Sequence, residues 1–515
     1  MTCLSRALLA AVSGAVLALG FTDVWTGVIW FALAPPLYWV AEARTKREAC
    51  GYAAVFAWAW TFPSLWFLAQ TTGYGAVAAA VYTGLWYIGG LMAVRCAVRR
   101  GVVSAVFGTA AIWCLIEIAR SRIPIFQFPW LLLGHATAPC EALRQGADLF
   151  GVYGLSFLAV SVNAVLAFVV VPLSAPRLPT AAGTPFARRV VLTTVLGTLF
   201  AALLYGRWRI AEIEPLLVEG PPRVAVVQGC EYQKLFRTDE EKWRQLNGHL
   251  ELHAQAAQRV PRPDLICWAE TMVPGVYNQD PYAERFRAVV REHGIPTLCG
   301  ADWIHPDDLA KTFPEQRWLN TALLLDGQAE TLGQYAKRRL VPFGEYVPLK
   351  QVFPFVEKMV QAISDFSPGS DIVLLPLPHC RLGTVICYEI IFPNLVRQFV
   401  ARGAQAIVNI TNDAWFGATS APVQHLAIAV FRAVENRRWI ARCANTGISA
   451  VITPSGRIQA RTDIFTETVL SDVLYCTTKK TVYTTFGDFF AQLCCAASVL
   501  IMLVALRQRR NPLFR

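Results

Sequence analysis

The sequence predicts a layered α/β domain inserted between the transmembrane helices of an eight-span helical membrane domain. Three observations support this fold class. Hydrophobic residues make up 55% of the 515-residue chain and charged residues only 16%, whereas a soluble domain carries about 25% charged residues. Apolar stretches of spanning length recur through the first 207 residues and return near the C-terminus. Between them, short β-rich runs alternate with helical patterns.

The apolar stretches divide the chain into three parts. Each stretch is long enough to cross the hydrocarbon core of a bilayer as one helix. The predicted spans are residues 4–21, 24–41, 50–70, 74–94, 101–119, 150–172, 190–207 and 484–506. We therefore expect seven transmembrane helices in residues 1–207, an inserted domain in residues 208–482, and an eighth helix with a tail in residues 483–515.

The net charge of +11 lies beside the spans and not in the inserted domain. Residues 208–482 carry 29 basic and 29 acidic residues, so the whole excess belongs to the remainder. This distribution argues against a nucleic-acid-binding surface. A basic residue, Arg6, lies at the start of the first span, and further basic residues follow the second, fourth, sixth and eighth spans, all of which fall on one side of the membrane. The positive-inside rule therefore predicts two cytoplasmic termini and an inserted domain outside the cytoplasm.

The inserted domain has a strand-and-helix rhythm. Its β-rich runs are residues 224–227, 265–268, 297–300, 322–325, 384–386 and 406–410. Helical patterns such as 239–257 and 423–439 separate several of them, which predicts one α/β layered core. Its seven cysteines are an odd number and so cannot all pair. His249 and His253 share a predicted helix without a third ligand nearby, so we expect no metal site.

Three reactive side chains stand near the ends of strand-like runs in this domain. Cys387 follows an apolar run and opens an amphipathic stretch, which predicts a strand, a sharp turn and a helix with the thiol at the corner. Because a thiol at a helix N-terminus ionises more easily, we expect a nucleophile. Glu270 could act as its general base, and Lys337 could stabilise the thiolate and an oxyanion. Beside a bilayer, these groups predict acyl chemistry on lipid.

Each of these features also has a simpler interpretation. A buried cysteine at a strand end is usually inert core. A lysine in a basic string, as at residues 337–339, is usually solvated. The aromatic loop at residues 128–130 could anchor the membrane interface or form one wall of a substrate cleft. The residues alone leave these alternatives open.

The strings around the reactive residues resemble a known family. WAE at 268–270, YAKRRLVPFGEYVP at 335–348 and CYE at 387–389 are similar to the three signature blocks of the nitrilase superfamily. Within it, the spans and the LVPFGEYVP string resemble the bacterial apolipoprotein N-acyltransferases over nearly the whole chain. The strings FPW at 128–130 and NITNDAWFG at 409–417 belong to the same resemblance.

The resemblance implies a nitrilase-like αββα sandwich and assigns roles to individual residues. The implied catalytic residues are the general base Glu270, the oxyanion and thiolate stabiliser Lys337, and the nucleophile Cys387. The implied supporting residues are Glu345, Tyr388 and Glu389. Substrate contacts would involve Trp130, Asn412 and Trp415. The resemblance implies no metal and no cofactor.

The implied reaction takes place in the bacterial cytoplasmic (inner) membrane, with the sandwich on the periplasmic side. Cys387 would accept an acyl chain from a phospholipid, phosphatidylethanolamine in this family, and form a thioester. The thioester would then acylate the N-terminal amino group of diacylglyceryl-cysteine in an apolipoprotein. An apolar stripe predicts a membrane-contacting lid at residues 350–366. The string QGCE at 228–231 departs from the family pattern after the first strand.

Two rival functions are compatible with the same residues. A membrane-tethered amidase, a carbon–nitrogen hydrolase, would use the three residues with water as acceptor, but eight spans favour lipid chemistry. A catalytically silent scaffold that binds lipoproteins would not need to retain Glu270, Lys337 and Cys387.

Overall fold

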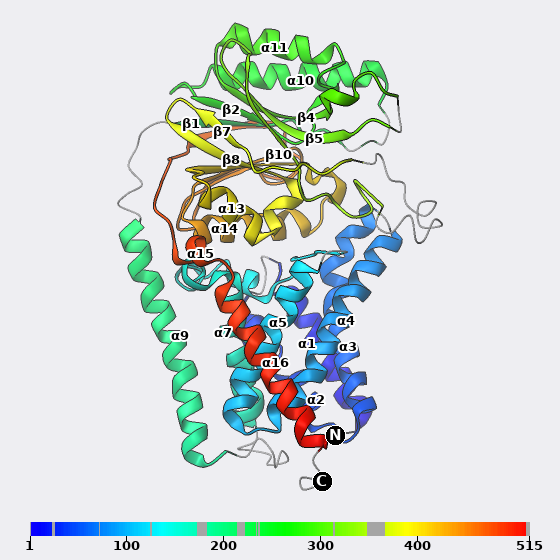
Figure 1. Cartoon of the computed structure of the whole chain (residues 1–515), viewed down its shortest axis with the longest axis vertical. Coiled ribbons are helices and arrows are strands. Elements are labelled where there is room, and N and C mark those ends of the chain that lie inside the picture. The colour runs from blue at the N-terminus through cyan, green and yellow to red at the C-terminus, as the bar shows by residue number, and fades with distance from the viewer. Residues whose placement is uncertain are drawn as a thin grey trace. The chain divides into compact units, whose positions relative to one another are not determined.

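The structure is a computed structural model that divides into two compact units. It describes residues 2–22, 26–71, 73–123, 126–171, 183–213, 222–232, 234, 237–312, 315–347 and 366–510. Unit 1 comprises Met1–Ala211 and Phe486–Arg515, and unit 2 comprises Glu212–Thr485. Unit 1 is helical, whereas unit 2 contains the β-sheets (Figure 1).

The helices of unit 1 match most of the predicted spans. They are α1 (Cys3–Leu19), α2 (Ala34–Glu42), α3 (Lys46–Leu65), α4 (Gly73–Val98), α5 (Thr109–Arg122), α6 (Glu141–Arg144), α7 (Ala147–Val165), α9 (Pro185–Ile213) and α16 (Phe489–Arg510). Among the described residues, six helical segments are long and apolar enough to cross a membrane: Lys46–Gln70, Gly73–Val98, Ser104–Arg122, Ala147–Val170, Pro185–Ile213 and Phe489–Gln508. They coincide with the third to eighth predicted spans.

The second predicted span, residues 24–41, is not one continuous helix. A 3-10 turn, η1 (Thr26–Trp30), is followed by a turn and by the nine-residue α2. Two prolines occupy the first turn of α2, where a missing N–H does no harm, whereas proline breaks a helix interior. The buried side chain of Asn163 forms hydrogen bonds with the backbone groups at this break. It accepts from the Leu33 N–H at 2.9 Å and donates to the Ile29 carbonyl at 2.7 Å. The expectation of eight spanning helices is therefore not confirmed.

Unit 2 contains two β-sheets in its described part. The first has the strand order β13-β1-β2-β4-β5-β6, with β3 beside β4, and the second has the order β12-β11-β10-β9-β8-β7. The strands of the first sheet are β1 (Arg223–Gln228), β2 (Leu265–Trp268), β3 (Val273–Val276), β4 (Thr297–Ile304), β5 (Trp318–Leu325), β6 (Thr331–Ala336) and β13 (Thr468–Val473). Those of the second are β7 (Leu374–Leu377), β8 (Cys380–Ile386), β9 (Ala406–Thr411), β10 (Ile440–Ala444), β11 (Ala450–Ile452) and β12 (Ile458–Arg461).

Helices cover the outer faces of both sheets. α10 (Asp239–Ala257) and α11 (Tyr282–His293) lie over the first sheet, and α13 (Pro393–Ala401) and α14 (Ala421–Asn436) lie over the second (Figure 1). The layers are therefore helix, sheet, sheet, helix. Strands β8, β9 and β10 are paired in parallel, and their buried apolar side chains are typical of strands covered on both faces. The predicted layered α/β fold is confirmed.

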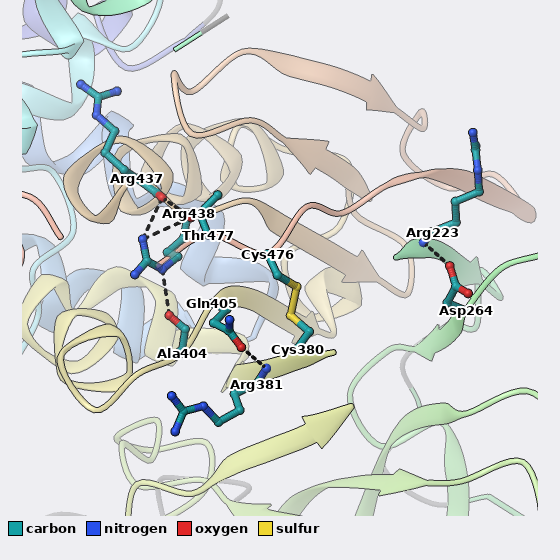
Figure 2. Close-up of a disulfide and its surroundings, with 10 residues drawn as sticks. All are labelled: Arg223, Asp264, Cys380, Arg381, Ala404, Gln405, Arg437, Arg438, Cys476 and Thr477. Carbon is teal, nitrogen blue, oxygen red and sulfur yellow. Dashed lines mark hydrogen bonds between the residues drawn. A yellow bond between two sulfur atoms is a disulfide. The ribbon is translucent and has the colours of Figure 1, made fainter. Parts of the chain in front are cut away.

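A disulfide joins the start of β8 to the segment that follows β13. Cys380 and Cys476 have a Cα–Cα distance of 5.9 Å, which suits the bond. Figure 2 shows the neighbouring Arg438 reaching the hydroxyl of Thr477, at 3.2 Å. The other described cysteines of unit 2 are free thiols: Cys230, Cys267, Cys299, Cys387 and Cys443. The predicted lid at 350–366 lies, except for Phe366, outside the described residues.

Candidate active site

The three predicted catalytic residues come from both sheets of unit 2 and lie in one buried cluster. Glu270 stands two residues after β2, and Lys337 directly follows β6. Cys387 directly follows β8 and is the first residue of a 3-10 turn, η8 (Cys387–Ile391). All three side chains belong to buried residues. Water is therefore largely excluded from a site that contains two charged groups and a thiol.

The Lys337 ammonium is held between two carboxylates. Its Nζ donates to Oε1 of Glu270 at 2.9 Å and to Oε1 of Glu345 at 2.8 Å. Burial lowers the pKa of Lys337, but the two carboxylates raise it by more, so the amine stays charged. Because an ammonium has three N–H groups, one remains for a further acceptor. Glu345 is itself fixed by the Val341 N–H, which donates to its Oε2 at 2.8 Å.

Asn320 on β5 completes this arrangement and was not predicted from the sequence. Its Nδ2 donates to Oε1 of Glu270 at 2.8 Å and to Oε1 of Glu345 at 3.1 Å. The amide and the ammonium of Lys337 thus bridge the same two oxygens. The only sequence signal is a polar residue at the start of an apolar strand, which by itself does not point to a site.

The backbone at Cys387 makes a sharp turn. Its φ is 49°, in the left-handed region that non-glycine residues enter only at a cost. The predicted turn with a thiol at the corner is present, but Cys387 opens a five-residue 3-10 turn and α13 begins only at Pro393.

The expectation of an easily ionised thiol is wrong for this structure. Burial raises the pKa of Cys387, and Glu270 raises it further, while Lys337 lowers it by less. The short 3-10 turn also lacks the aligned dipoles of a full helix. The Cys387 side chain at rest is therefore a protonated thiol within electrostatic reach of both charged groups, and it would need a base in order to act as a nucleophile.

Glu389 fastens the segments that carry the thiol and the lysine to each other. Its Oε1 accepts from the Tyr335 hydroxyl at 2.7 Å and from the N–H groups of Arg338 and Arg339 at 2.8 and 3.1 Å. Its Oε2 accepts from the Ile386 N–H at 2.8 Å. One buried carboxylate thus holds the end of β6, which Lys337 follows, together with the end of β8, which Cys387 follows. We call these hydrogen bonds the Glu389 clamp.

Asn412 is engaged with the protein in this structure. Its backbone N–H donates to Oε2 of Glu270 at 3.0 Å. Its side-chain oxygen accepts from the Ala414 N–H at 3.2 Å and from Nδ2 of Asn445 at 3.0 Å. Its geometry suits orientation of the Glu270 carboxylate, while its predicted role as a substrate contact stays a prediction.

Of the other predicted residues, Tyr388 and Trp415 belong to unit 2 and Trp130 belongs to unit 1. Tyr388 is buried, with its ring edge-on to Phe392 at 5.1 Å between centroids. Trp415 is partly exposed in η9 (Asp413–Phe416). Trp130 belongs to unit 1, where it is buried with its ring centroid 5.3 Å from that of Phe67. Among the described residues, no group of three or more His, Cys, Asp or Glu side chains is placed to hold a metal ion.

The arrangement combines the three functions that acyl transfer through sulfur requires. A thiol stands at a strained corner, a carboxylate within electrostatic reach could act as its base, and an ammonium has one N–H that could donate to a developing oxyanion. The bridging Asn320 and the Glu389 clamp fix these groups before any substrate is present. Such preorganised charge is the main source of stabilisation for an oxyanion in a site that excludes water.

Comparisons with known proteins match both units. Residues 13–165 match the family model "Apolipoprotein N-acyltransferase N-terminal domain", and residues 223–476 match "Carbon-nitrogen hydrolase". The chain is similar to apolipoprotein N-acyltransferase of Geobacter metallireducens, with 34% identity over 98% of this chain and 95% of that protein. It is also similar to apolipoprotein N-acyltransferase of Methylococcus capsulatus, with 30% identity over 98% of this chain and 97% of that protein. Among solved structures, an amidase from Nesterenkonia sp. AN1 aligns with 54% of this chain and 98% of its own, at 22% identity and a TM-score of 0.40.

Proposed function

Because the chain belongs to the apolipoprotein N-acyltransferase family, we propose that it moves an acyl chain from a membrane phospholipid, through a thioester on Cys387, to the N-terminal amino group of diacylglyceryl-cysteine in apolipoproteins. The observation that carries this proposal is the similarity over nearly the full chain, which includes the membrane unit as well as the catalytic one. The cluster of Glu270, Lys337 and Cys387 supplies the chemistry.

The first half-reaction forms the thioester. Glu270 takes the proton of the Cys387 thiol as the sulfur attacks the ester carbonyl of the phospholipid. The free N–H of Lys337 donates to the resulting oxyanion. When the tetrahedral intermediate collapses, the carbon–oxygen bond breaks and the leaving alkoxide takes the proton back from Glu270. The products are the acylated Cys387 and a lysophospholipid. We propose phosphatidylethanolamine as the donor, as the family resemblance implies.

In the second half-reaction, Glu270 and Lys337 act again while the thioester on Cys387 is broken. The unprotonated α-amino group attacks the thioester carbonyl, and Glu270 accepts a proton from the attacking nitrogen. The oxyanion again lies against Lys337. The carbon–sulfur bond then breaks, and Glu270 returns the proton to the departing Cys387 thiolate, which restores the thiol at its raised pKa.

Acyl transfer to an amine is favoured over the two rival functions. Hydrolysis by a tethered amidase would not require the membrane unit, whose match to the N-terminal domain of acyltransferases spans residues 13–165. A silent scaffold would not require an ammonium held between two carboxylates beside a buried thiol.

We further propose that unit 2 lies on the periplasmic side and that both termini are cytoplasmic. The Cys380–Cys476 disulfide supports this side, because disulfides persist in oxidising compartments. Within unit 1, Arg6 pairs with Glu42 at 3.5 Å, and Arg95 donates to the carbonyls of Val40 and Ala43 at 2.6 and 2.9 Å. Basic residues from two predicted cytoplasmic segments thus contact a third such segment, the end of α2, at one end of the bundle, as the positive-inside rule expects.

The test is to isolate the thioester and then to transfer it. The full chain in vesicles containing phosphatidylethanolamine should gain the mass of one acyl chain on Cys387, and a diacylated lipopeptide should then remove it and become triacylated. The Cys387→Ala variant serves as the control and should show neither event. Release of free fatty acid without lipopeptide acylation would refute transfer in favour of hydrolysis, and no adduct in the wild type would refute the covalent mechanism.

A further inference from the structure

Asp302 on β4 is a carboxyl group beside the site that the mechanism above does not use. Its cross-strand partner in the antiparallel β4–β5 pair is Asn320, so both side chains leave the sheet on the same face. The Asp302 carbonyl accepts from the Tyr277 N–H at 2.9 Å, and the Asn320 carbonyl accepts from the Lys337 N–H at 2.8 Å. The two residues therefore direct their backbone groups away from each other. They form a non-hydrogen-bonded pair, in which side chains approach most closely.

Two buried oxygens at this pair have no hydrogen-bond partner in the described part of the chain. They are Oδ1 of Asp302 and Oδ1 of Asn320. The Asn320 amide nitrogen is committed to Glu270 and Glu345, so its oxygen faces elsewhere and requires a donor. A carboxylate at Asp302 would offer only a second acceptor, whereas a carboxylic acid would offer an O–H. Leaving both oxygens unsatisfied is costly in a buried site.

We propose that Asp302 is a positioning residue for acyl transfer, which as the neutral acid donates its proton to Oδ1 of Asn320 and thereby holds the Asn320 amide nitrogen against the two site carboxylates. Loss of that proton would remove the donor and add a third anion opposite the single ammonium of Lys337. The amide could then rotate, and Glu270 would lose one of the donors that aim it at the thiol. This inference rests on the proposed function.

The balance of burial and charge around Asp302 favours its neutral form below about pH 7. The charged groups that face it are Glu270 at the end of β2, Lys337 at the end of β6, and Glu345. Burial, and then the charges of Glu270 and Glu345, raise the pKa of Asp302 to about 7, against the lowering effect of Lys337. The residue as a whole is partly exposed while its Oδ1 is buried. The carboxyl group is thus protonated below about pH 7, and above about pH 7 it loses its proton to the solvent.

The decisive measurement is the pH dependence of the first half-reaction alone. The full chain in detergent is mixed with phosphatidylethanolamine that carries a fluorescent acyl chain, and the rate of thioester formation on Cys387 is followed without acceptor between about pH 5.5 and about pH 9. Omitting the lipopeptide removes the titration of its amine. For the wild type, we expect a rate about tenfold lower at pH 8 than at pH 6, since one protonated group is required.

Two variants separate positioning from a merely structural role. Asp302→Asn supplies an N–H donor at every pH, so we expect a rate within about threefold of the wild type at pH 6 and no transition near pH 7. Asp302→Ala supplies no donor, so we expect a rate about tenfold below that of Asp302→Asn at pH 6. If Asp302→Ala fails to fold, the pH profile of thioester formation by Asp302→Asn tests the proposal by itself.

The outcomes distinguish this inference from the proposed function. A transition near pH 7 that persists in Asp302→Asn, or an Asp302→Ala variant as fast as Asp302→Asn, would overturn the role of Asp302 and leave the thioester mechanism intact. A wild type that forms no thioester on Cys387 at any pH would overturn the proposed function itself.

Discussion

Removing the Cys380–Cys476 disulfide should destabilise unit 2 by an amount that follows from the length of chain it closes. The two cysteines are 96 residues apart. In the chain-entropy model, a crosslink over a loop of about that length stabilises the folded state by about 4.7 kcal/mol, because it restricts the unfolded chain. An unfolding entropy of about 2.1 cal/mol/K per residue, over the roughly 270 residues of unit 2, converts this into a fall in Tm of about 8 °C.

The perturbation is the double variant Cys380→Ser, Cys476→Ser in the full chain in detergent. The assay is the temperature at which unit 2 becomes cleavable by a protease. Reductant should lower this temperature for the wild type by the same amount and leave the double variant unchanged. Cys230→Ser is the matched control, since Cys230 is a free, partly exposed cysteine of the same unit. Equal temperatures for variant and wild type, with the disulfide proved intact by mass spectrometry, would refute the reasoning from chain entropy.

Three further perturbations address the site directly. The rate of alkylation of Cys387 should rise about tenfold per pH unit through the alkaline range, because burial raises its pKa; a plateau near neutral pH would show an ionised thiol instead. Lys337→Met should slow thioester formation by about 100-fold or more, since it removes the oxyanion donor, and a smaller loss would assign that role elsewhere. Glu389→Gln should lower the free energy of unfolding by about 1–3 kcal/mol, since an amide N–H₂ must face one of the backbone donors that the carboxylate now accepts, and it should slow thioester formation. Glu251→Gln, on the exposed face of α10, should change neither quantity.

Sequence patterns predict those parts of this structure that depend on the properties of one continuous segment. The spans from residue 46 onward could be predicted because their apolar length is a property of one continuous segment. The segment 24–41 passes the same hydropathy test, but the test ignores the two prolines in the first turn of α2, which prevent one continuous helix. The corner at Cys387 could likewise be predicted, since an apolar run followed by an amphipathic stretch marks a strand-to-helix turn.

What could not be predicted depends on contacts between distant segments. Asn320 gains its role only because β5 brings it between the ends of β2 and β6. The raised pKa of Cys387 reflects burial in the folded domain, which a rule about helix ends leaves out. Cys380 and Cys476 could not be chosen as partners among seven cysteines, because only the sheet places their Cα atoms 5.9 Å apart.

The hydrogen bonds of Glu389 have a consequence for the proposed mechanism, in which two unlike lipids react in turn at one thiol. Because a single carboxylate anchors the backbone beside both Lys337 and Cys387, the distance between ammonium and sulfur is set when the chain folds. Neither donor nor acceptor has to spend binding energy on assembling the reacting groups, and all of it remains for recognising the lipid itself. In the proposed mechanism, both half-reactions then use the same fixed arrangement of groups, and their order depends on whether the sulfur already carries an acyl chain.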